Sequence, residues 1–313
     1  MKKTSIGGQA VMEGVMMKNQ DQYAVAVRKP NKEIEVFVDQ YESFVKKNKI
    51  FALPLIRGVV SFAESMIVGM KTLTYSASFF EEEEEKPSKF ENWLQQKTNG
   101  KAEDVLMGVT VCISILMAIG IFMVLPFFIS SLLKSWISSP MLLSLVEGVI
   151  RIAIFLGYVT LISQMKEIKR VFMYHGAEHK TINCFESGEE LTPENVKKYS
   201  RLHKRCGTSF LLIVMIISIL FFMWIRVDNV FLKVLCRILL VPVIAGVSYE
   251  FIRLAGKSDS KVVCFLSKPG LMLQNLTTKE PDLDMIEVAI CSVEAVLDWR
   301  AYQQAMRDGE LED

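Results

Sequence analysis

Hydrophobic and polar residues are segregated along this chain, with four long apolar runs separated by polar segments. The runs cover residues 105–133, 141–162, 208–225 and 230–252. A bilayer core requires about 20 apolar residues in a helix, because an isolated strand leaves its backbone groups unsatisfied in lipid. The pattern predicts an α-helical membrane protein with four transmembrane helices, two within residues 105–163 and two within residues 208–252.

The first fifty residues, 1–50, are polar and predict the β-rich start of a cytoplasmic α+β domain. Residues 23–28 and 33–38 alternate between apolar and polar side chains and are separated by a Pro-Asn pair. This pattern predicts an N-terminal β-hairpin. Residues 7–17 contain three glycines, which predict a tight turn or a close approach of the backbone to another group.

Residues 51–80 predict a helix that lies in the membrane surface. They are mostly apolar, but Arg57, Glu64 and Lys71 recur at seven-residue spacing and form one charged stripe. An apolar helix with a single polar stripe is typical of a segment in the bilayer interface or packed on a helix bundle. Residues 81–104 begin with five consecutive glutamates and predict a charged linker.

Two further polar regions complete the expected cytoplasmic domain. Residues 164–207 form a loop region that contains the histidines, and residues 253–313 form the C-terminal part. In the latter, two apolar pieces around Lys268-Pro-Gly270 are too short to span and predict a surface hairpin or an interfacial patch. Residues 282–306 predict an amphipathic helix that packs on the cytoplasmic domain. Its apolar face consists of Ile286, Ala289, Ile290, Val293, Val296 and Leu297.

The distribution of charge predicts the orientation in the membrane. Nine lysines and arginines fall within residues 164–208, whereas Lys134 is alone between the first two runs. Because positively charged loops stay in the cytoplasm, we expect a multi-pass protein of the plasma membrane with both termini cytoplasmic. The six cysteines form no C-x-x-C pair, which is in keeping with a reducing compartment. A net charge of +1 indicates no nucleic-acid partner, and the lipid bilayer is the expected one.

All three histidines of the chain lie in the polar region between the second and third runs. His175 and His179 belong to an H-x-x-E-H phrase that includes Glu178. On a helix over residues 166–182 the two imidazoles share one face, which suits two-point binding of one metal ion. Glu178 is then placed to orient a bound water or to take its proton. The phrase is the mirrored form of H-E-x-x-H, known as the inverzincin arrangement.

A catalytic zinc ion requires a third protein ligand. His203 is the first candidate because it is the remaining histidine of the same region. Cys206 offers a thiolate three residues later, and Glu250 is expected at the cytoplasmic end of the fourth run. Two other carboxylates complete the candidates, Glu186 and Glu13. The predicted ligands of a divalent metal ion, most simply zinc, are His175, His179 and His203.

A purely structural interpretation accounts for the same residues. The histidines would be polar groups at the membrane interface, and Phe172 and Tyr174 would belong to an aromatic belt. Cys184 and Cys206 would be small core residues. The gathering of all three histidines in one region favours a metal site over this interpretation, although such a site can be structural as well as catalytic.

Three phrases of the chain resemble the YqhQ family of bacterial membrane proteins. They are residues 7–17, 174–184 and 205–210. The resemblance covers nearly the whole chain. It implies membership of a family of unknown function whose members are described as predicted metal-dependent enzymes.

The resemblance also implies site residues. His175, Glu178 and His179 match the H-x-x-E-H phrase of the family, and Glu13 falls in the glycine-rich phrase that looks like a second part of the same site. Lys204 stands where the similar phrase around the third histidine has a proline, so this loop lacks a rigid residue. Outside the pentapeptide the chain does not resemble the soluble inverzincins.

These observations predict a metal-dependent hydrolase at the cytoplasmic membrane face, with Glu178 or Glu13 as general base. The location suits a lipid-linked or peptide substrate. The first alternative is a non-enzymatic scaffold or an assembly and insertion factor, in which the metal contributes folding energy. The second alternative is a transporter, for which four helices would require a homo-oligomer. Its hints are three charged residues within the runs, Glu147, Arg151 and Arg237, of which the first two are spaced to pair on one helix.

Overall fold

A computed structural model describes residues 6–80, 102–225, 227, 229–257 and 260–308. Contacts between residues divide the chain into two compact units. The first unit comprises Met1–Phe80, Tyr158–Ile217 and Leu240–Asp313, and the second comprises Glu81–Gly157 and Ser218–Leu239. The linker predicted over 81–104 lies outside the described residues except for its last three, which begin a helix.

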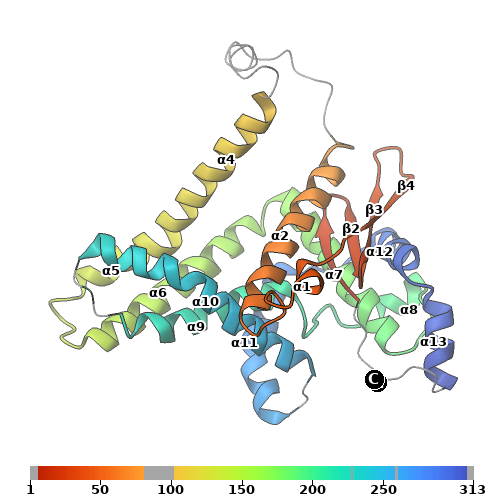
Figure 1. Ribbon diagram of the computed structural model, residues 1–313. Helices are drawn as coiled ribbons and strands as arrows, with labels where there is room; N and C mark the ends of the chain where they lie inside the picture. The colour runs from red at the N-terminus through yellow and green to blue at the C-terminus, as the bar shows by residue number, and fades with distance from the viewer. Residues whose placement is uncertain (1–5, 81–101, 226, 228, 258–259, 309–313) are drawn as a thin grey trace. The chain divides into compact units, whose positions relative to one another are not determined.

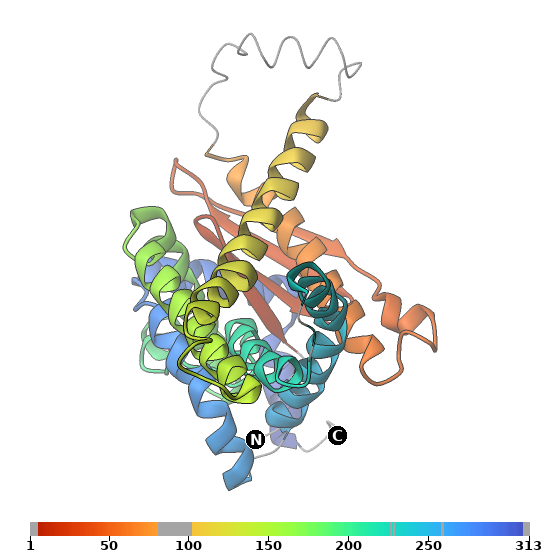
Figure 2. The same cartoon turned by 90° about the vertical axis from the view of Figure 1, so that its left-hand side faces the viewer.

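A four-stranded antiparallel sheet in the order β1-β2-β3-β4 forms the centre of the first unit (Figures 1 and 2). Its strands are β1 (Gly7–Val11), β2 (Gly14–Asn19), β3 (Gln22–Arg28) and β4 (Ile34–Gln40). The predicted hairpin is confirmed as β3 and β4. The glycine-rich phrase forms a second hairpin, β1 and β2, which the sequence analysis did not predict. A turn is present there as expected, with Glu13 in a left-handed conformation (φ 48°).

Helices cover both faces of this sheet. On one face, α7 (Lys166–Glu186) and α12 (Leu283–Val296) bury a set of alternating small and apolar side chains. The set consists of Val15, Met17, Ala24 and Ala26. On the other face, α2 (Ile56–Ala77) packs its Val68 against a second apolar set, Val11, Met16, Tyr23, Val25 and Val27. Successive side chains of a strand point to opposite sides of the sheet, so β2 and β3 contribute side chains to both buried sets.

Short helices complete the first unit. They are α1 (Phe44–Lys47), α8 (Pro193–Lys197) and α13 (Trp299–Asp308). The helix predicted over 282–306 is interrupted, because Leu297 is extended (φ −155°, ψ 126°) and separates α12 from α13. The predicted apolar face is nevertheless buried through Val296, since α12 packs on the sheet beside α7.

The prediction of a surface hairpin around residues 268–270 is wrong. Residues Lys261–Thr277 form one helix, α11, with Pro269 inside it. The side chain of Ser260 caps its start by accepting a hydrogen bond from the Val263 N–H. Such a cap satisfies one of the backbone donors that a helix start leaves free, and it favours a helix over a turn.

Three stretches of the described chain are long and apolar enough to cross a membrane: Val105–Leu132, Pro140–Ile162 and Phe231–Ala255. The first comprises α4 (Ala102–Ile119), a π-helical turn η1 (Gly120–Val124) and α5 (Leu125–Leu132), and the others correspond to α6 (Pro140–Ile162) and α10 (Val230–Lys257). The remaining apolar run forms α9 (Gly207–Phe222), a helix of 16 residues. At about 24 Å it is shorter than a bilayer core of roughly 30 Å, so four spans are not confirmed.

Charged side chains are buried among the apolar helices of the second unit. Glu147 and Arg151 pair on α6 as predicted (2.8 Å), and Arg237 of α10 makes two further bonds to Glu147 (2.5 and 2.8 Å). Arg151 also donates to the Phe122 carbonyl (2.9 Å), whose α-helical donor position is occupied by Pro126, which lacks an N–H. These contacts satisfy polar groups that would be costly to bury alone.

Candidate metal centre

The H-x-x-E-H phrase lies in the middle of α7, as the sequence predicts. His179 is 1 % exposed and Glu178 is 5 % exposed, while His175 is half-buried. Three or four residues of an α-helix make one turn, so the three side chains leave α7 from neighbouring positions. The phrase therefore places two imidazoles and a carboxylate inside the first unit rather than on its surface.

Three side chains bring a potential ligand atom to one place. They are His175, His179 and Cys206, whose ligand atoms all lie within 4.8 Å of one another. The Cys206 Sγ lies 3.2 Å from Nε2 of His175, and the two imidazole centroids are 4.4 Å apart with the rings edge to face. A zinc ion binds nitrogen at about 2.0 Å and sulfur at about 2.3 Å, which separates its donors by roughly 3–4 Å. The three atoms are thus close to coordination distance.

Backbone carbonyls orient both imidazoles. Nδ1 of His175 donates to the Thr277 carbonyl (2.8 Å), and Nδ1 of His179 donates to the Arg201 carbonyl (2.6 Å). A carbonyl oxygen only accepts, so the proton of each neutral ring is on Nδ1 and the lone pair is on Nε2. Metal-binding histidines commonly have this arrangement, in which the second ring nitrogen is held by a carbonyl or carboxylate.

The Nε2 atom of His179 lacks a hydrogen-bond partner among the described residues, although it is buried. Buried polar atoms are rarely left in this state, because the loss of water is then uncompensated. Burial also lowers the pKa of His179, which favours the neutral imidazole that binds a metal. An acceptor atom without a donor, directed at a second imidazole and a thiol, fits a bound cation.

The loop that carries Cys206 is held in place from α7. Lys180 is buried and donates to the carbonyls of Lys197 and Tyr199 (3.0 and 2.7 Å), and Asn183 donates to those of Ser200 and Leu202 (2.7 and 3.1 Å). Both side chains follow the H-x-x-E-H phrase within the next turn of α7. The Arg201 carbonyl is thereby brought to the His179 ring.

The same loop is held a second time from α11. The Gln274 side chain accepts from the His203 N–H and donates to the His203 carbonyl, each at 2.8 Å. The Thr208 N–H and hydroxyl lie 3.4 and 3.2 Å from the Cys206 sulfur. Thr277, which ends α11, supplies the carbonyl that binds His175. Three segments distant in sequence therefore converge on one group of donors.

A glycine allows α7 to approach the segment that follows α11. A Cβ atom at Gly176 would collide with the carbonyl oxygen of Lys279. The Lys279 N–H donates to the Phe172 carbonyl at 2.8 Å, one turn earlier on α7. Because Gly176 follows His175 directly, this close contact also brings the His175 ring to the carbonyl of Thr277.

Glu178 points from α7 toward strand β1. Its Oε2 atom is buried without a hydrogen-bond partner among the described residues, and the backbone of Gly8 hydrogen-bonds to the carboxyl group. Burial raises the pKa of Glu178 to about 7, while His175 and the Gly8 backbone oppose that rise. A Cβ at Gly8 would lie 3.0 Å from the Glu178 Cγ, so the glycine-rich phrase does provide the close backbone approach that was expected of it.

His203 lies beside the group rather than within it. Its ring centroid is 5.7 Å from that of His179, and its Nε2 lies 3.7 Å from a carboxylate oxygen of Glu186. Glu186 also accepts a hydrogen bond from Arg205. The third potential ligand beside His175 and His179 is therefore Cys206, a secondary candidate in the sequence, and not His203, the first candidate.

The other candidate carboxylates are bound elsewhere. Glu13 forms a bidentate ion pair with Arg170 and accepts from the Tyr174 hydroxyl at 3.3 Å. Glu250 forms a bidentate ion pair with Arg57. Neither belongs to the group around His175, and the pairing of Glu13 links the first hairpin to α7.

The amino-acid sequence is similar to that of a known protein family. Residues 53–299 match the family described as "Protein of unknown function (DUF1385)". This chain belongs to the DUF1385 family. It is 36% identical over 294 residues to a Bacillus subtilis (strain 168) protein described as "Uncharacterized protein YqhQ", a match that covers 93% of this chain and 92% of the relative. No solved structure matches the chain.

The predicted resemblance to the YqhQ family is thus confirmed. Neither description states an activity, so the DUF1385 assignment leaves the chemistry to the residues themselves. Sequence reasoning missed the carbonyls of Thr277 and Arg201 and the side chain of Gln274, which position the donors. A backbone carbonyl has no signature in a single sequence, because every residue has one.

Proposed function

We propose that His175, His179 and Cys206 bind one divalent metal ion, most simply zinc, and that this centre carries out hydrolysis. The donor set supports zinc, because two imidazoles and a thiolate suit a borderline-soft cation better than a hard one. Three protein donors leave one position of a tetrahedral site for water or substrate, as in catalytic zinc sites.

One observation carries the proposal. Both imidazoles donate through Nδ1 to backbone carbonyls. Nε2 of His175 lies 3.2 Å from the Cys206 sulfur, and a ring nitrogen of His179 lies within 4.8 Å of the other two ligand atoms. Nε2 of His179 is buried without a hydrogen-bond partner among the described residues, and a bound cation would supply one. In the metal-free protein the thiol hydrogen lies between Cys206 and His175 (3.2 Å), and a bound cation takes the place of that proton.

In this proposal Glu178 handles the protons of the hydrolysis. A bound metal ion supplies Lewis-acid chemistry and makes water more acidic. The Glu178 carboxylate accepts one proton from the attacking water, whose oxygen bonds to the electrophilic atom of the substrate. The bond to the leaving group then breaks, and the leaving group receives that proton from Glu178.

The charge pattern supports a cytoplasmic location for the site. The lysine-rich and arginine-rich region 164–208 contains two of the three donors on α7 and the third just before α9. Positively charged segments stay on the cytoplasmic side. A site next to apolar helices favours a lipid-linked or peptide substrate.

A non-enzymatic scaffold is the second candidate, and one observation favours it. His179 and Cys206 are 1 % and 7 % exposed, and a cation there would join α7, the loop before α9 and the end of α11. Such a centre would stabilise the fold whether or not it also performs chemistry.

Metal analysis of the purified protein tests the centre. We expect close to one zinc per chain in the wild type, and loss of the metal from H179A and from C206A. H203A, which alters the neighbouring imidazole outside the group, is the matched control and should retain the metal. Retention by H179A, or loss from H203A alone, would show that the ligands are different.

The E178Q variant separates the enzyme from the scaffold. It should keep the metal and the unfolding temperature of the wild type, because the amide has the size of the carboxyl group. If the centre is hydrolytic, lipid or peptide extracts of cells with E178Q should accumulate a compound that cells with the wild type cleave. Identical extracts, together with retained metal, would favour the scaffold.

A further inference from the structure

Helix α2 exposes a continuous apolar face. Phe62, Met66, Met70 and Leu73 are spaced three or four residues apart and are between 39 % and 55 % exposed. The segment before the helix adds further exposed apolar side chains, Ile50, Phe51, Leu53 and Leu55. Contiguous apolar patches on a protein surface are usually covered by a partner or by a membrane.

The charged stripe of α2 pairs with other segments of the protein, although Lys71 also stays exposed. Its three members are each bound by another segment: Arg57 by Glu250, Glu64 by Ser43 and the Phe44 N–H, and Lys71 by Asp39. A surface helix of a soluble protein shows the opposite arrangement, with its apolar side against the core. On α2, therefore, the apolar side is the exposed one.

Contacts with two apolar helices indicate what covers this face. Gly58 packs on Gly246 and Tyr249 of α10, so closely that a Cβ there would lie 2.8–3.0 Å from them. Both partners belong to the apolar stretch Phe231–Ala255. Four residues further along α2, the Phe62 ring lies 5.4 Å from the ring of Phe210 in the first turn of α9. The start of α2 thus packs on the second half of α10 and on the first turn of α9.

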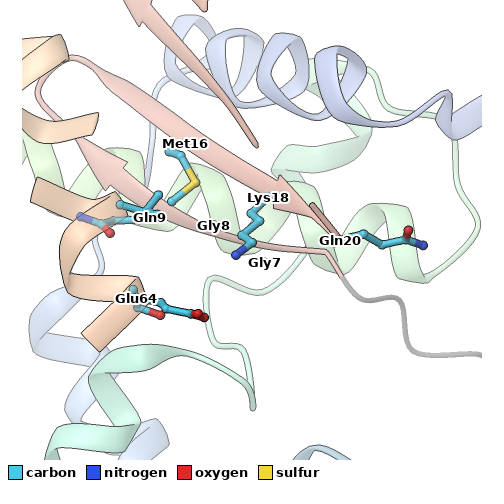
Figure 3. Close-up of a pocket in the computed structure, with 9 residues that line it drawn as sticks. Gly7, Gly8, Gln9, Met16, Lys18, Gln20 and Glu64 are labelled. Atoms are coloured by element: carbon cyan, nitrogen blue, oxygen red, sulfur yellow. The ribbon is translucent and has the colours of Figure 1, made fainter. Parts of the chain in front are cut away.

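A pocket of about 330 Å³ lies beside this face, between α2 and the sheet (Figure 3). β1 and β2 contribute Gly7, Gly8, Gln9, Met16 and Lys18, the following turn contributes Gln20, and α2 contributes Glu64, Ser65 and Val68. Gly7 opposes Lys18 in the strand pairing, and its missing side chain leaves the space open. Ser65 is exposed and adjoins Met66, so the pocket opens next to the apolar face of α2.

Lys18 is the one cationic residue among those that line this pocket. Its ammonium lies 4.7 Å from the centre of the Tyr41 ring, and no described residue accepts a hydrogen bond from it. Glu64 points toward it across the pocket (Figure 3), but both Glu64 oxygens already accept from Ser43 and one also accepts from the Phe44 N–H. Burial lowers the pKa of Lys18, and Glu64 and Asp21 oppose that effect. A half-buried ammonium whose three donors have no acceptor in the described part of the chain fits an anionic oxygen ligand.

We infer that α2 lies in the membrane surface with its apolar face in lipid, and that the pocket at Lys18 holds the phosphate of a membrane phospholipid. The acyl chains of that lipid run along Phe62 and Met66 into the bilayer, and the headgroup reaches Lys18 past Ser65. The packing of α2 on the apolar stretch of α10 supports a lipid as the source of the phosphate, because the headgroup layer lies directly outside the apolar core.

This lipid site is independent of the proposed metal centre. The pocket lies on the face of the sheet that α2 covers, whereas α7 packs on the opposite face. A substitution at Lys18 should therefore leave the zinc content unchanged, and a substitution at Cys206 should leave lipid binding unchanged.

Photo-crosslinking in membranes tests the inference. The full chain carries benzoylphenylalanine at Ser65, beside the pocket, or at Met66, on the apolar face, and is irradiated in phospholipid vesicles. We expect a phospholipid adduct at both positions by mass spectrometry. K18A should reduce the adduct at Ser65 roughly tenfold, since a charge-assisted hydrogen bond is lost, and should leave the adduct at Met66 unchanged.

Matched variants identify which part of the inference fails. K18R keeps the charge and should retain the adduct at Ser65, whereas G7F should remove it by filling the pocket, because a Cβ at Gly7 meets no described atom within 4 Å. A crosslink from Met66 to a second copy of the chain, or none at all, would refute the membrane-surface location. An adduct at Ser65 that is indifferent to K18A and G7F would refute the headgroup site.

A competition experiment separates a lipid from a soluble ligand. Inorganic phosphate or glycerol 3-phosphate is added in large excess to the vesicles before irradiation. We expect no decrease of the adduct at Ser65, because the soluble compounds lack the acyl chains that contact α2. Displacement by either compound would overturn the lipid assignment in favour of a soluble phosphate.

Discussion

The substitution G176A tests how α7 is brought to the metal centre. Gly176 follows His175 and touches the carbonyl of Lys279, where a Cβ atom cannot be accommodated without movement. To relieve the collision, α7 and residue 279 must separate by about 1 Å. Two hydrogen bonds cross this contact, from Lys279 to the Phe172 carbonyl and from His175 to the Thr277 carbonyl, each at 2.8 Å. Both would be stretched beyond the range of a hydrogen bond.

The expected loss of stability follows from these contacts. Each hydrogen bond contributes about 1 kcal/mol net, and the strain of overpacking adds about 1–3 kcal/mol. Alanine is favoured over glycine in a helix by about 1 kcal/mol, which offsets part of the loss. The net destabilisation is about 2–4 kcal/mol, or a decrease in Tm of roughly 4–16 °C for a unit of this size. Zinc affinity should also decrease by about 10–100-fold, as for other losses of a group that orients a ligand.

Thermal unfolding of the detergent-solubilised protein and zinc titration measure the two effects. The matched control is G157A in α6, where a new Cβ meets no atom of the described chain within 4 Å. That variant should be as stable as the wild type or slightly more stable. Unfolding of G176A at the same temperature as G157A, together with wild-type zinc affinity, would show that Gly176 does not control the approach of α7 to residue 279.

Two further predictions concern other buried groups. E147Q removes the carboxylate that pairs with Arg151 and Arg237, and the uncompensated charges should lower the free energy of unfolding in detergent by about 3–5 kcal/mol; an unchanged unfolding profile would contradict this. Burial raises the pKa of Cys184 to about 12, so only about one thiol in 10⁴ is ionised at pH 8. Peptide mass spectrometry should show that iodoacetamide leaves Cys184 unmodified until the protein is unfolded, whereas rapid alkylation of the folded protein would show that the thiol is accessible.

The elements that were predicted correctly have a regular period. Apolar and polar side chains alternate over residues 23–38, as in a strand whose neighbouring side chains point to opposite faces of a sheet. This alternation predicted β3 and β4. The run that became α10 likewise contains enough apolar residues to be recognised without any partner.

The elements that were missed depend on tertiary contacts. The β1–β2 hairpin contains three glycines, which are unfavourable in an isolated strand. At two of them, Gly8 and Gly14, close approaches to Met16, Glu178 and Ala26 leave no room for a larger side chain. Helix α11 contains Pro269, which removes one helical hydrogen bond. Packing of Gly270 on Ser209 and the bonds from Gln274 to the loop before α9 hold this helix nevertheless.

The sequence by itself determined that apolar helices flank a polar region and that His175 and His179 share one helix face, because a helix repeats every 3.6 residues wherever it lies. Only the tertiary structure decided which third donor joins them. His203 and Cys206 are three residues apart in one loop, and local spacing does not distinguish them. Hydrogen bonds with Lys180, Asn183 and Gln274 hold that loop so that the Cys206 thiol, rather than the His203 imidazole, lies next to His175 and His179.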